Sequence, residues 1–439
     1  MIKKTFEEAF TPEWIETNVQ DGANELVVIR RIIPWDAIIG QLAKFYDDKA
    51  GANGISLRIM AAVLILSRFR KLSDREVVKQ IKENRYMQFF CNVPDIGLQT
   101  FLHPATLCLF RKRIGEEGCA AIEDQVFEML RLSGVIVGND ALMDSTVLPS
   151  DIVYPNDVQL VFKAFKKMRS LAKLHGLPLW WNDQKVKELW RQFNLDKKGN
   201  RIEWLASFNE IFVPALETFK ERVESLNASP RQKAKAEKTL ALLELLEEQT
   251  VQKLAGEKRI ENRIVSLDDP DARPIKKGKK NPDCEFGSTL QTTFNRDGFM
   301  ITVENFIGSP NDSTLYPNTL DLYIKRMSGC PGFVVTDLGY RSRANLNEKT
   351  PGKVEVFMGR SGDVSEENRD HCRKARSATE GFIAVAKNLR GFGKSLWHMT
   401  KGHAMWSRLC QAACNLKKFL QLLGKDKIGE ESLVKLGLA

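Results

Sequence analysis

The chain has 439 residues, 43% of them apolar and 28% charged, which is an ordinary globular composition with room for two or three domains. The longest strongly apolar run, AAVLIL at 61–66, is far too short to span a bilayer, and the N-terminal stretch MIKKTFEEAFTPEWIE lacks the apolar core of a signal peptide. The net charge of +10 favours a polyanionic partner, most commonly nucleic acid. We therefore expect a cytoplasmic protein with no membrane segment.

Residues 1–133 show helical patterns and are expected to form a helical N-terminal domain. Ser73 and Glu76 have the spacing of a capping box, and Pro104 suits the first turn of another helix. That helix carries the basic cluster Arg111 to Arg113 toward its end. Short helices with a basic last member suit a helix-turn-helix-like DNA reader, but a plain helical bundle with solvated arginines fits this pattern equally well.

The composition changes at Gly134, and the β-branched, apolar residues at 141–148 predict a buried strand. Helical patterns with many charges return at about 157–263. This block interrupts a β-containing region, so we interpret it as a helical insertion. Its tryptophans, Trp180, Trp181 and Trp190, supply large apolar surfaces that could pack internally or against a partner.

A polar, lysine-rich connector at 268–283 precedes a predicted hairpin, in which residues 286–294 and 299–308 flank the turn NRDG. A helix at 314–329, strands at 332–337 and 353–358, and a long C-terminal helix follow. This order of elements indicates an α/β fold with a mixed sheet that contains a hairpin.

Common catalytic and cofactor motifs are absent, including GxxxxGK[ST], GxGxxG, GxSxG and HExxH. None of the five histidines lies in a motif typical of catalysis, which argues against serine- or cysteine-triad chemistry. The eight cysteines contain no CxxC pair, and the spacing of Cys410 and Cys414 from the upstream histidines fits no common zinc signature. We expect reduced thiols, and carboxylates at strand ends remain as the candidate functional groups.

Asp144 lies within the predicted strand, where an aspartate is disfavoured and costly to bury unless its charge is compensated, for example by a divalent cation. The alternative is a turn aspartate beside a strand that ends earlier, an interpretation that suits Asp140 better. Asp337 ends the strand at 332–337, where functional groups of α/β sheets gather, although a strand-terminal aspartate often only starts a loop.

Glu380 is the acidic residue of the basic stretch RKARSATEGFIAVAK. At about 100° per residue, Arg376 lies about 40° from it around a helix, and Lys387 lies within about 20°. The three side chains therefore form one stripe, which is either a solvated ion pair of small energetic value or a metal ligand beside two phosphate-binding cations.

Several blocks of this sequence resemble the signature blocks of bacterial insertion-sequence transposases of the DDE type, in the group that spans insertion-sequence families four and five. Arg376, Glu380 and Lys387 match that group's helix signature of Tyr, two residues, Arg, three residues, Glu, six residues and Lys. The chain departs from the signature at Arg373, which replaces the tyrosine. The similar blocks are GISLRIMAAVLILSRFRKLSDREVVKQI (54–81), MDSTVLPSDIVYPND (143–157), VVTDLGYRSRANL (334–346) and ARSATEGFIAVAKNLRGFG (375–393).

The resemblance implies a ribonuclease H-like core in which Asp144, Asp337 and Glu380 hold two Mg²⁺ ions, with Mn²⁺ able to substitute. Hard cations prefer carboxylate oxygens, and a pair of them suits in-line displacement at phosphorus without a nucleophilic side chain. The candidate DNA contacts are Arg373, Arg376 and Lys387, together with Arg111 and Arg113.

The expected organisation is a DNA-end-binding domain at 1–133, a catalytic core at 134–156 and 264–425, the insertion at 157–263 between the first two catalytic carboxylates, and a tail at 426–439. The resemblance implies cleavage and strand transfer at the ends of the protein's own element. The partners would be the terminal inverted repeats, target DNA and at least one further copy of the chain, with nucleoid association on binding. Two alternatives are a ribonuclease H-like nuclease without strand transfer and a domesticated DNA-binding protein with an inactive core.

Overall fold

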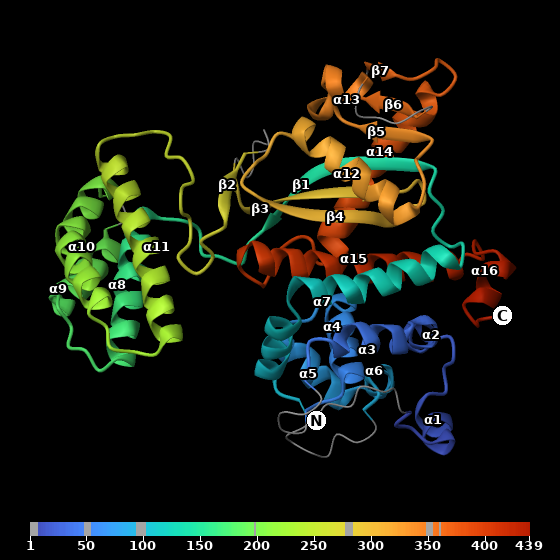
Figure 1. Cartoon of the computed structure of the whole chain (residues 1–439), viewed down its shortest axis with the longest axis horizontal. Helices are drawn as coiled ribbons and strands as arrows, with labels where there is room; N and C mark the ends of the chain where they lie inside the picture. The colour runs from blue at the N-terminus through green and yellow to red at the C-terminus, as the bar shows by residue number, and fades with distance from the viewer. Residues whose placement is uncertain are drawn as a thin grey trace. The chain divides into compact units, whose positions relative to one another are not determined.

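The computed structural model describes residues 8–47, 54–93, 102–196, 199–276, 284–347, 354–359 and 361–439. The chain divides into two compact units. The first joins Met1–Pro149 to Thr289–Ala439, and the second is Ser150–Ser288. Figure 1 shows the elements of both units. None of the helices in the described ranges combines the length and apolarity that crossing a membrane requires.

The N-terminal part of the first unit is helical, as predicted. The run that contains AAVLIL lies in α4, which is buried along almost its whole length, together with its polar residues Arg58, Ser67 and Arg68. Ser73 and Glu76 form the predicted capping box of α5, and Pro104 occupies the first turn of α7. Gly115, with φ of 60°, kinks α7. The helices are α1 (Pro12–Asn18), α2 (Glu25–Ile32), α3 (Trp35–Ala43), α4 (Leu57–Phe69), α5 (Asp74–Glu83), α6 (Arg85–Cys91) and α7 (Pro104–Leu132).

The sheet has the strand order β2-β3-β1-β5-β6-β7, and β4 also pairs with β3. It is mixed, as predicted: β5 runs parallel to β1 and to β6, whereas β3 and β4 form the predicted antiparallel hairpin. The predicted strand at 353–358 corresponds to β6, and its first residue, 353, lies outside the described ranges. The strands are β1 (Asp140–Pro149), β2 (Arg273–Ile275), β3 (Glu285–Phe294), β4 (Met300–Ile307), β5 (Phe333–Thr336), β6 (Glu355–Met358) and β7 (Ser361–Asp363).

Alternation along β1 divides the core into two clusters. Leu142 packs in a cluster with Val335 and residues of α14, whereas Met143 packs with Val334 and residues of α12. The predicted C-terminal helix is in fact two helices, α14 and α15, and the expected tail contains α16. These helices are α12 (Asp312–Met327), α13 (Arg343–Asn347), α14 (Arg369–Leu389), α15 (Met399–Leu423) and α16 (Glu430–Lys435), with a 3₁₀ turn, η1 (Leu338–Tyr340).

A buried ion network connects the N-terminal helices to the elements around the sheet. Glu123 on α7 is fully buried and accepts two hydrogen bonds from Arg326 on α12, at 2.8 and 2.7 Å. Arg408 on α15 lies 3.4 Å from the same carboxylate. Two guanidinium groups therefore compensate the one buried charge, and α7, which also packs along α15, belongs to the same compact unit as the sheet.

The second unit, at 150–288, has its own aromatic core. Trp190 stacks on Phe162 with the ring centroids 4.2 Å apart, and Trp180 stacks on Phe219 at 5.8 Å. Trp181 packs against Phe165, so all three tryptophans pack internally. The helices of this unit are α8 (Asp157–Leu174), α9 (Asp183–Leu195), α10 (Arg201–Glu224) and α11 (Pro230–Leu254).

We predict that Glu123→Gln lowers the free energy of unfolding by about 3–5 kcal/mol, because it leaves Arg326 and Arg408 buried without their shared carboxylate. Urea unfolding would measure the change. Glu128→Gln on the same helix is the control, since its pair with Arg131 is partly exposed and should contribute at most about 1 kcal/mol. Equal losses for the two variants would contradict a special role for the buried network.

Candidate active site

Asp144 lies in the middle of β1, on the face that α14 covers. Its Oδ1 accepts a hydrogen bond from the Ser145 backbone N–H at 2.8 Å, and its Oδ2 accepts one from Arg376 at 3.0 Å. Thr292 on the neighbouring β3 donates its hydroxyl to the Asp144 carbonyl at 3.0 Å. The aspartate is a true strand residue, so the turn interpretation is wrong for it. Asp140, which suited that interpretation better, is also in β1, at its first position.

Asp337 follows β5 directly and caps the 3₁₀ turn η1. Its Oδ1 accepts a hydrogen bond from the Gly339 N–H at 2.9 Å. A Cβ at position 339 would lie 3.1 Å from that oxygen, so a larger residue would crowd the Asp337 carboxylate. The buried Tyr340 then donates its hydroxyl to Gln291 on β3 at 2.7 Å. The sequence Asp-Leu-Gly-Tyr thus anchors the turn that presents the Asp337 carboxylate.

Glu380 and Arg376 lie one turn apart on α14. The helix buries Cys372, Ala375 and Thr379 against the sheet and leaves Glu380 exposed. Arg376 comes from the edge of the buried face, so its guanidinium reaches the middle of β1 and the end of β5.

One guanidinium contacts the three carboxylates that the sequence singled out. Arg376 lies 3.0 Å from Asp144, 4.0 Å from Asp337 and 3.7 Å from Glu380. The carboxylates come from three elements far apart in sequence. They surround the arginine and do not converge on a single point: in the described part of the chain, no group of three or more His, Cys, Asp and Glu side chains is arranged to hold a metal ion.

Exposure increases across the three carboxylates. The side chain of Asp144 is 12% exposed, that of Asp337 39% and that of Glu380 71%. Burial raises the pKa of Asp144 to about 6; Arg376 opposes this shift and Asp337 adds to it. The three carboxylates therefore form a negatively charged surface that is buried at Asp144 and exposed to solvent at Glu380.

Lys387 lies near the same strand, with its Nζ 3.4 Å from the hydroxyl of Thr146, two residues beyond Asp144 on the same face of β1. Arg373 is exposed on α14. The structure thus brings Arg376 and Lys387 to the face of β1 that holds Asp144. The sequence placed Arg376 beside Glu380, but its contacts with the two aspartates depend on tertiary packing and were not predicted.

The N-terminal candidates lie in different surroundings. Arg111 is buried, donates two hydrogen bonds to Asp74 at 2.9 and 2.7 Å, and lies over the ring of Trp397. These contacts give Arg111 a structural role in the protein without DNA, and its contact with DNA stays a prediction. Arg113 is exposed, and its guanidinium lies 4.6 Å from the ring centroid of Tyr46.

All eight cysteines are free. Burial raises the pKa of the Cys410 thiol to about 12, and the neighbouring Arg68 only partly opposes this shift. Cys410 packs with Trp406 in the core beneath α14, as expected for a small buried residue. The sequence likewise predicts no zinc site at Cys410 and Cys414.

Comparisons with known proteins identify the class. Residues 15–113 match a family model described as a transposase domain (DUF772). An uncharacterized protein of Rhizobium meliloti, ORF8 in the nfe locus, is 32% identical over 157 residues, which are 35% of this chain and 75% of that protein. No solved structure matches the chain. The matched domain indicates an enzyme that processes DNA. The chain belongs to a transposase family.

The raised pKa of Asp144 predicts a stability cost at neutral pH. In the unfolded chain this carboxyl ionises near 3.8, whereas in the folded protein it ionises near 6. The wild type should therefore lose stability as pH rises between these values. Asp144→Asn has no such cost, so its stability relative to wild type should improve by about 1–3 kcal/mol between pH 4 and pH 7.

Urea unfolding in the presence of EDTA at both pH values would measure this difference. Asp370→Asn is the control, because Asp370 is an exposed α14 carboxylate paired with Lys374, and its loss should bring no gain at pH 7. A difference between wild type and Asp144→Asn that stays constant with pH would contradict the prediction.

Proposed function

We propose that this transposase is of the DDE type and that it cleaves and joins DNA at the ends of its own insertion sequence. The catalytic residues would be Asp144, Asp337 and Glu380 on a ribonuclease H-like core. The single observation that supports this most strongly is that all three carboxylates lie within 4.0 Å of the Arg376 guanidinium. The mixed sheet adds support, because β1 lies between the β3–β4 hairpin and the parallel strands β5 and β6.

The donor set suits Mg²⁺, which prefers carboxylate oxygens. Asp144, Asp337 and Glu380 would hold the ions, and two bound ions would stabilise the attacking and leaving oxygens of an in-line displacement at phosphorus. Arg376 occupies the space among the carboxylates, so its side chain must withdraw from at least some of them. A guanidinium displaced in this way is well suited to a phosphate of the DNA strand. Lys387, beside Thr146, would hold a second phosphate.

The protein needs no nucleophilic side chain for this reaction. Water attacks in the cleavage step, and a DNA 3′-hydroxyl attacks in the joining step. Joining two element ends requires that at least two copies of the chain meet on DNA, which supports a dimer or a higher oligomer in the active complex. A nuclease would stop after the first step, so the joined product is the observation that separates the two activities.

We predict that Asp144→Asn, Asp337→Asn and Glu380→Gln each reduce cleavage by about 10³-fold or more, because each removes a ligand whose ions contribute several kcal/mol to transition-state stabilisation. DNA affinity should change little, since it depends mainly on phosphate contacts elsewhere. The assay would use the full chain, Mg²⁺ and a labelled duplex that contains the inverted repeats flanking the gene.

Asp370→Asn, with its exposed carboxylate on the same helix, should retain wild-type cleavage. Near-normal cleavage by any of the three site variants would remove that residue from the proposed site. Cleavage without any joined product would favour the nuclease. A wild type that binds the duplex but does not cut it would favour a DNA-binding protein with an inactive core.

We also predict opposite effects of Arg376→Gln on metal binding and on cleavage. Loss of the guanidinium removes the positive charge that competes with a cation, so Mn²⁺ should bind more tightly to the protein without DNA. Cleavage should fall, because the variant lacks a phosphate contact. Electron paramagnetic resonance would measure Mn²⁺ binding, with Arg373→Gln on the same helix as the control. Weaker Mn²⁺ binding by Arg376→Gln would instead show that Arg376 orients the carboxylates.

A further inference from the structure

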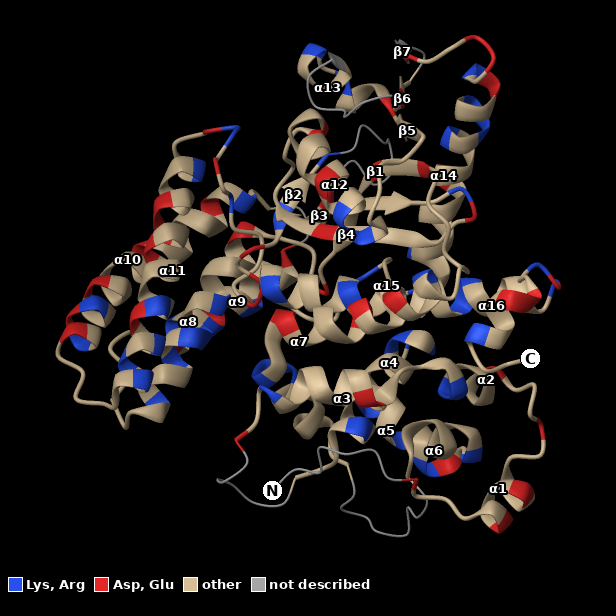
Figure 2. Cartoon of the chain, turned by 45° about the vertical axis from the view of Figure 1, so that its right-hand side comes forward, with Lys and Arg blue, Asp and Glu red and all other residues tan. Residues whose placement is uncertain are grey.

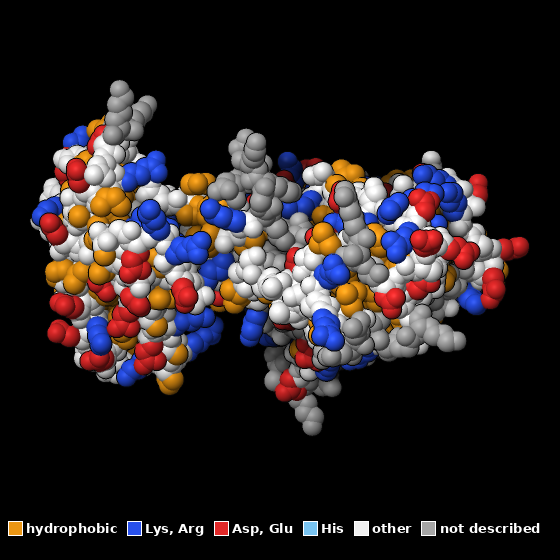
Figure 3. All heavy atoms as spheres, turned by 90° about the horizontal axis from the view of Figure 1, so that it is seen from above, with side chains coloured by type: hydrophobic (Ala, Val, Ile, Leu, Met, Phe, Trp, Pro, Cys, Tyr) orange, Lys and Arg blue, Asp and Glu red, His pale blue; other side chains and the backbone are white. Residues whose placement is uncertain are grey.

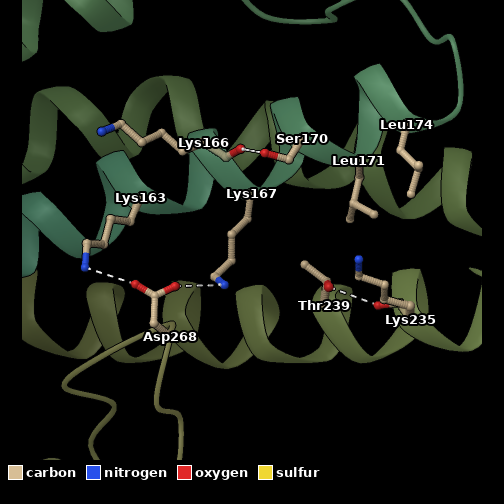
Figure 4. A pocket seen from close by; sticks show the side chains of 9 residues that line it. All are labelled: Lys163, Lys166, Lys167, Ser170, Leu171, Leu174, Lys235, Thr239 and Asp268. Carbon is tan, nitrogen blue, oxygen red and sulfur yellow. Dashed lines mark hydrogen bonds and ion pairs between the residues drawn. The ribbon is translucent and has the colours of Figure 1, made fainter. Parts of the chain in front are cut away.

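A lysine-lined groove lies between α8 and α11 in the second unit. Its volume is about 410 Å³. Figure 4 shows lysines from both helices along it, with Leu171 and Leu174 on the α8 side. The groove is lined by Lys163, Lys166, Lys167, Ser170, Leu171, Leu174, Lys235, Thr239 and Asp268.

An anion already lies at one end of this groove. The Asp268 carboxylate bridges two ammonium groups, with one oxygen 3.2 Å from Lys163 and the other 3.2 Å from Lys167. Burial would raise the pKa of Asp268, but the two lysines outweigh burial and lower it. The carboxylate is half-exposed, and it shows that these two ammonium groups are placed to hold an anionic group with two oxygens.

The lysine charge exceeds what Asp268 can balance. Lys235 projects from α11 into the groove, and Lys166 extends along α8 away from Asp268, with its Nζ 4.7 Å from the Phe162 ring centroid (Figure 4). Neither lysine forms an ion pair with a carboxylate of the described chain. Four lysines thus line the groove and one aspartate opposes them.

The basic character continues beyond the groove. Helix α8 has five lysines and arginines but only one acidic residue, Asp157, in its first turn. Figure 2 shows this concentration of basic residues along α8, and in Figure 3 lysine and arginine side chains gather toward one side of the second unit. The first half of α11 adds Arg231, Lys233 and Lys238, with Glu237 as its one acidic residue. Such a one-sided charge attracts an extended polyanion more strongly than a small anion.

We propose that the groove between α8 and α11 binds the phosphodiester backbone of duplex DNA, with Lys163, Lys166, Lys167 and Lys235 as phosphate contacts. The proposal rests on the proposed function, in which DNA is the substrate. In the free protein, Asp268 takes the place of a phosphate between Lys163 and Lys167. On binding, a phosphate competes with this carboxylate, so Asp268 limits affinity. Lysines contact phosphates irrespective of base sequence, so the groove contributes affinity and no sequence preference.

The first test neutralises the groove with K163Q, K166Q, K167Q and K235Q combined in the full chain. A control with the same change in charge combines K185Q, K187Q, K220Q and K258Q, whose lysines do not line the groove. Binding to an element-end duplex and to an unrelated duplex would be measured by fluorescence anisotropy over a range of salt concentrations. Each phosphate contact contributes about 0.9 to the slope of log affinity against log salt, so the groove variant should lose about 2 or more from this slope.

The second test is D268N, which frees Lys163 and Lys167. It should bind both duplexes several-fold more tightly and with a steeper salt dependence, because it removes a negative charge that competes with phosphate for these two lysines. If Asp268 only positioned the lysines, its loss would weaken binding. Urea unfolding of each variant would show that its fold is retained, and a variant less stable than wild type would be measured at a lower temperature at which it is folded.

The outcomes separate this proposal from the proposed function. If the wild type binds neither duplex at low salt, the proposed function fails and the groove proposal fails with it. If the wild type binds and cleaves DNA while the groove variant and the control have equal affinities and equal slopes, only the groove proposal fails. Weaker binding by D268N would also overturn it, because Asp268 would then position the lysines and not compete with phosphate.

Discussion

The charge balance between Arg376 and its carboxylates is the constraint on which the site depends. Asp144 is largely buried, and without a nearby cation its ionised form would be costly. Arg376 supplies that cation and at the same time contacts Asp337 and Glu380. A single positive charge cannot fully balance three negative ones, so the ionised site has a net negative charge that further cations would stabilise. In the proposed function, divalent cations would provide that stabilisation, and the guanidinium that they displace would contact a phosphate of the DNA.

The fold maintains this arrangement by fixing the elements that carry the charges. Asp144 depends on β1, Asp337 on the turn anchored by Tyr340, and Arg376 on the buried face of α14. The N-terminal helices contribute through Glu123, whose partners lie on α12 and α15. Because α12 covers one face of the sheet and α15 packs along β4, this network connects α7, whose first part lies in the matched transposase domain, to the sheet that bears the site.

The sequence predicted local features well and long-range contacts poorly. The hairpin, the capping box at Ser73 and the start of α7 follow from interactions between residues a few positions apart, and the structure confirms them. The role of Arg111 could not be predicted, because its basic neighbours indicate an exposed cluster, whereas its partner Asp74 lies 37 residues away. The contact between Arg376 and Asp144 spans 232 residues, and only the packing of α14 on β1 brings it about.

The second unit shows why a long insertion is compatible with this sheet. The chain leaves the first unit after β1 and returns through β3, which is the neighbouring strand in the sheet. Within the unit, the Ser150 N–H donates to the Phe286 carbonyl at 2.9 Å, so the two ends of the unit lie side by side. A segment whose ends meet in this way can form its own core without disturbing the ladder on either side. The surface residues of the second unit can then change without affecting the first unit. Lysines that bind a polyanionic partner can accumulate on α8 without disturbing the packing around the carboxylate site.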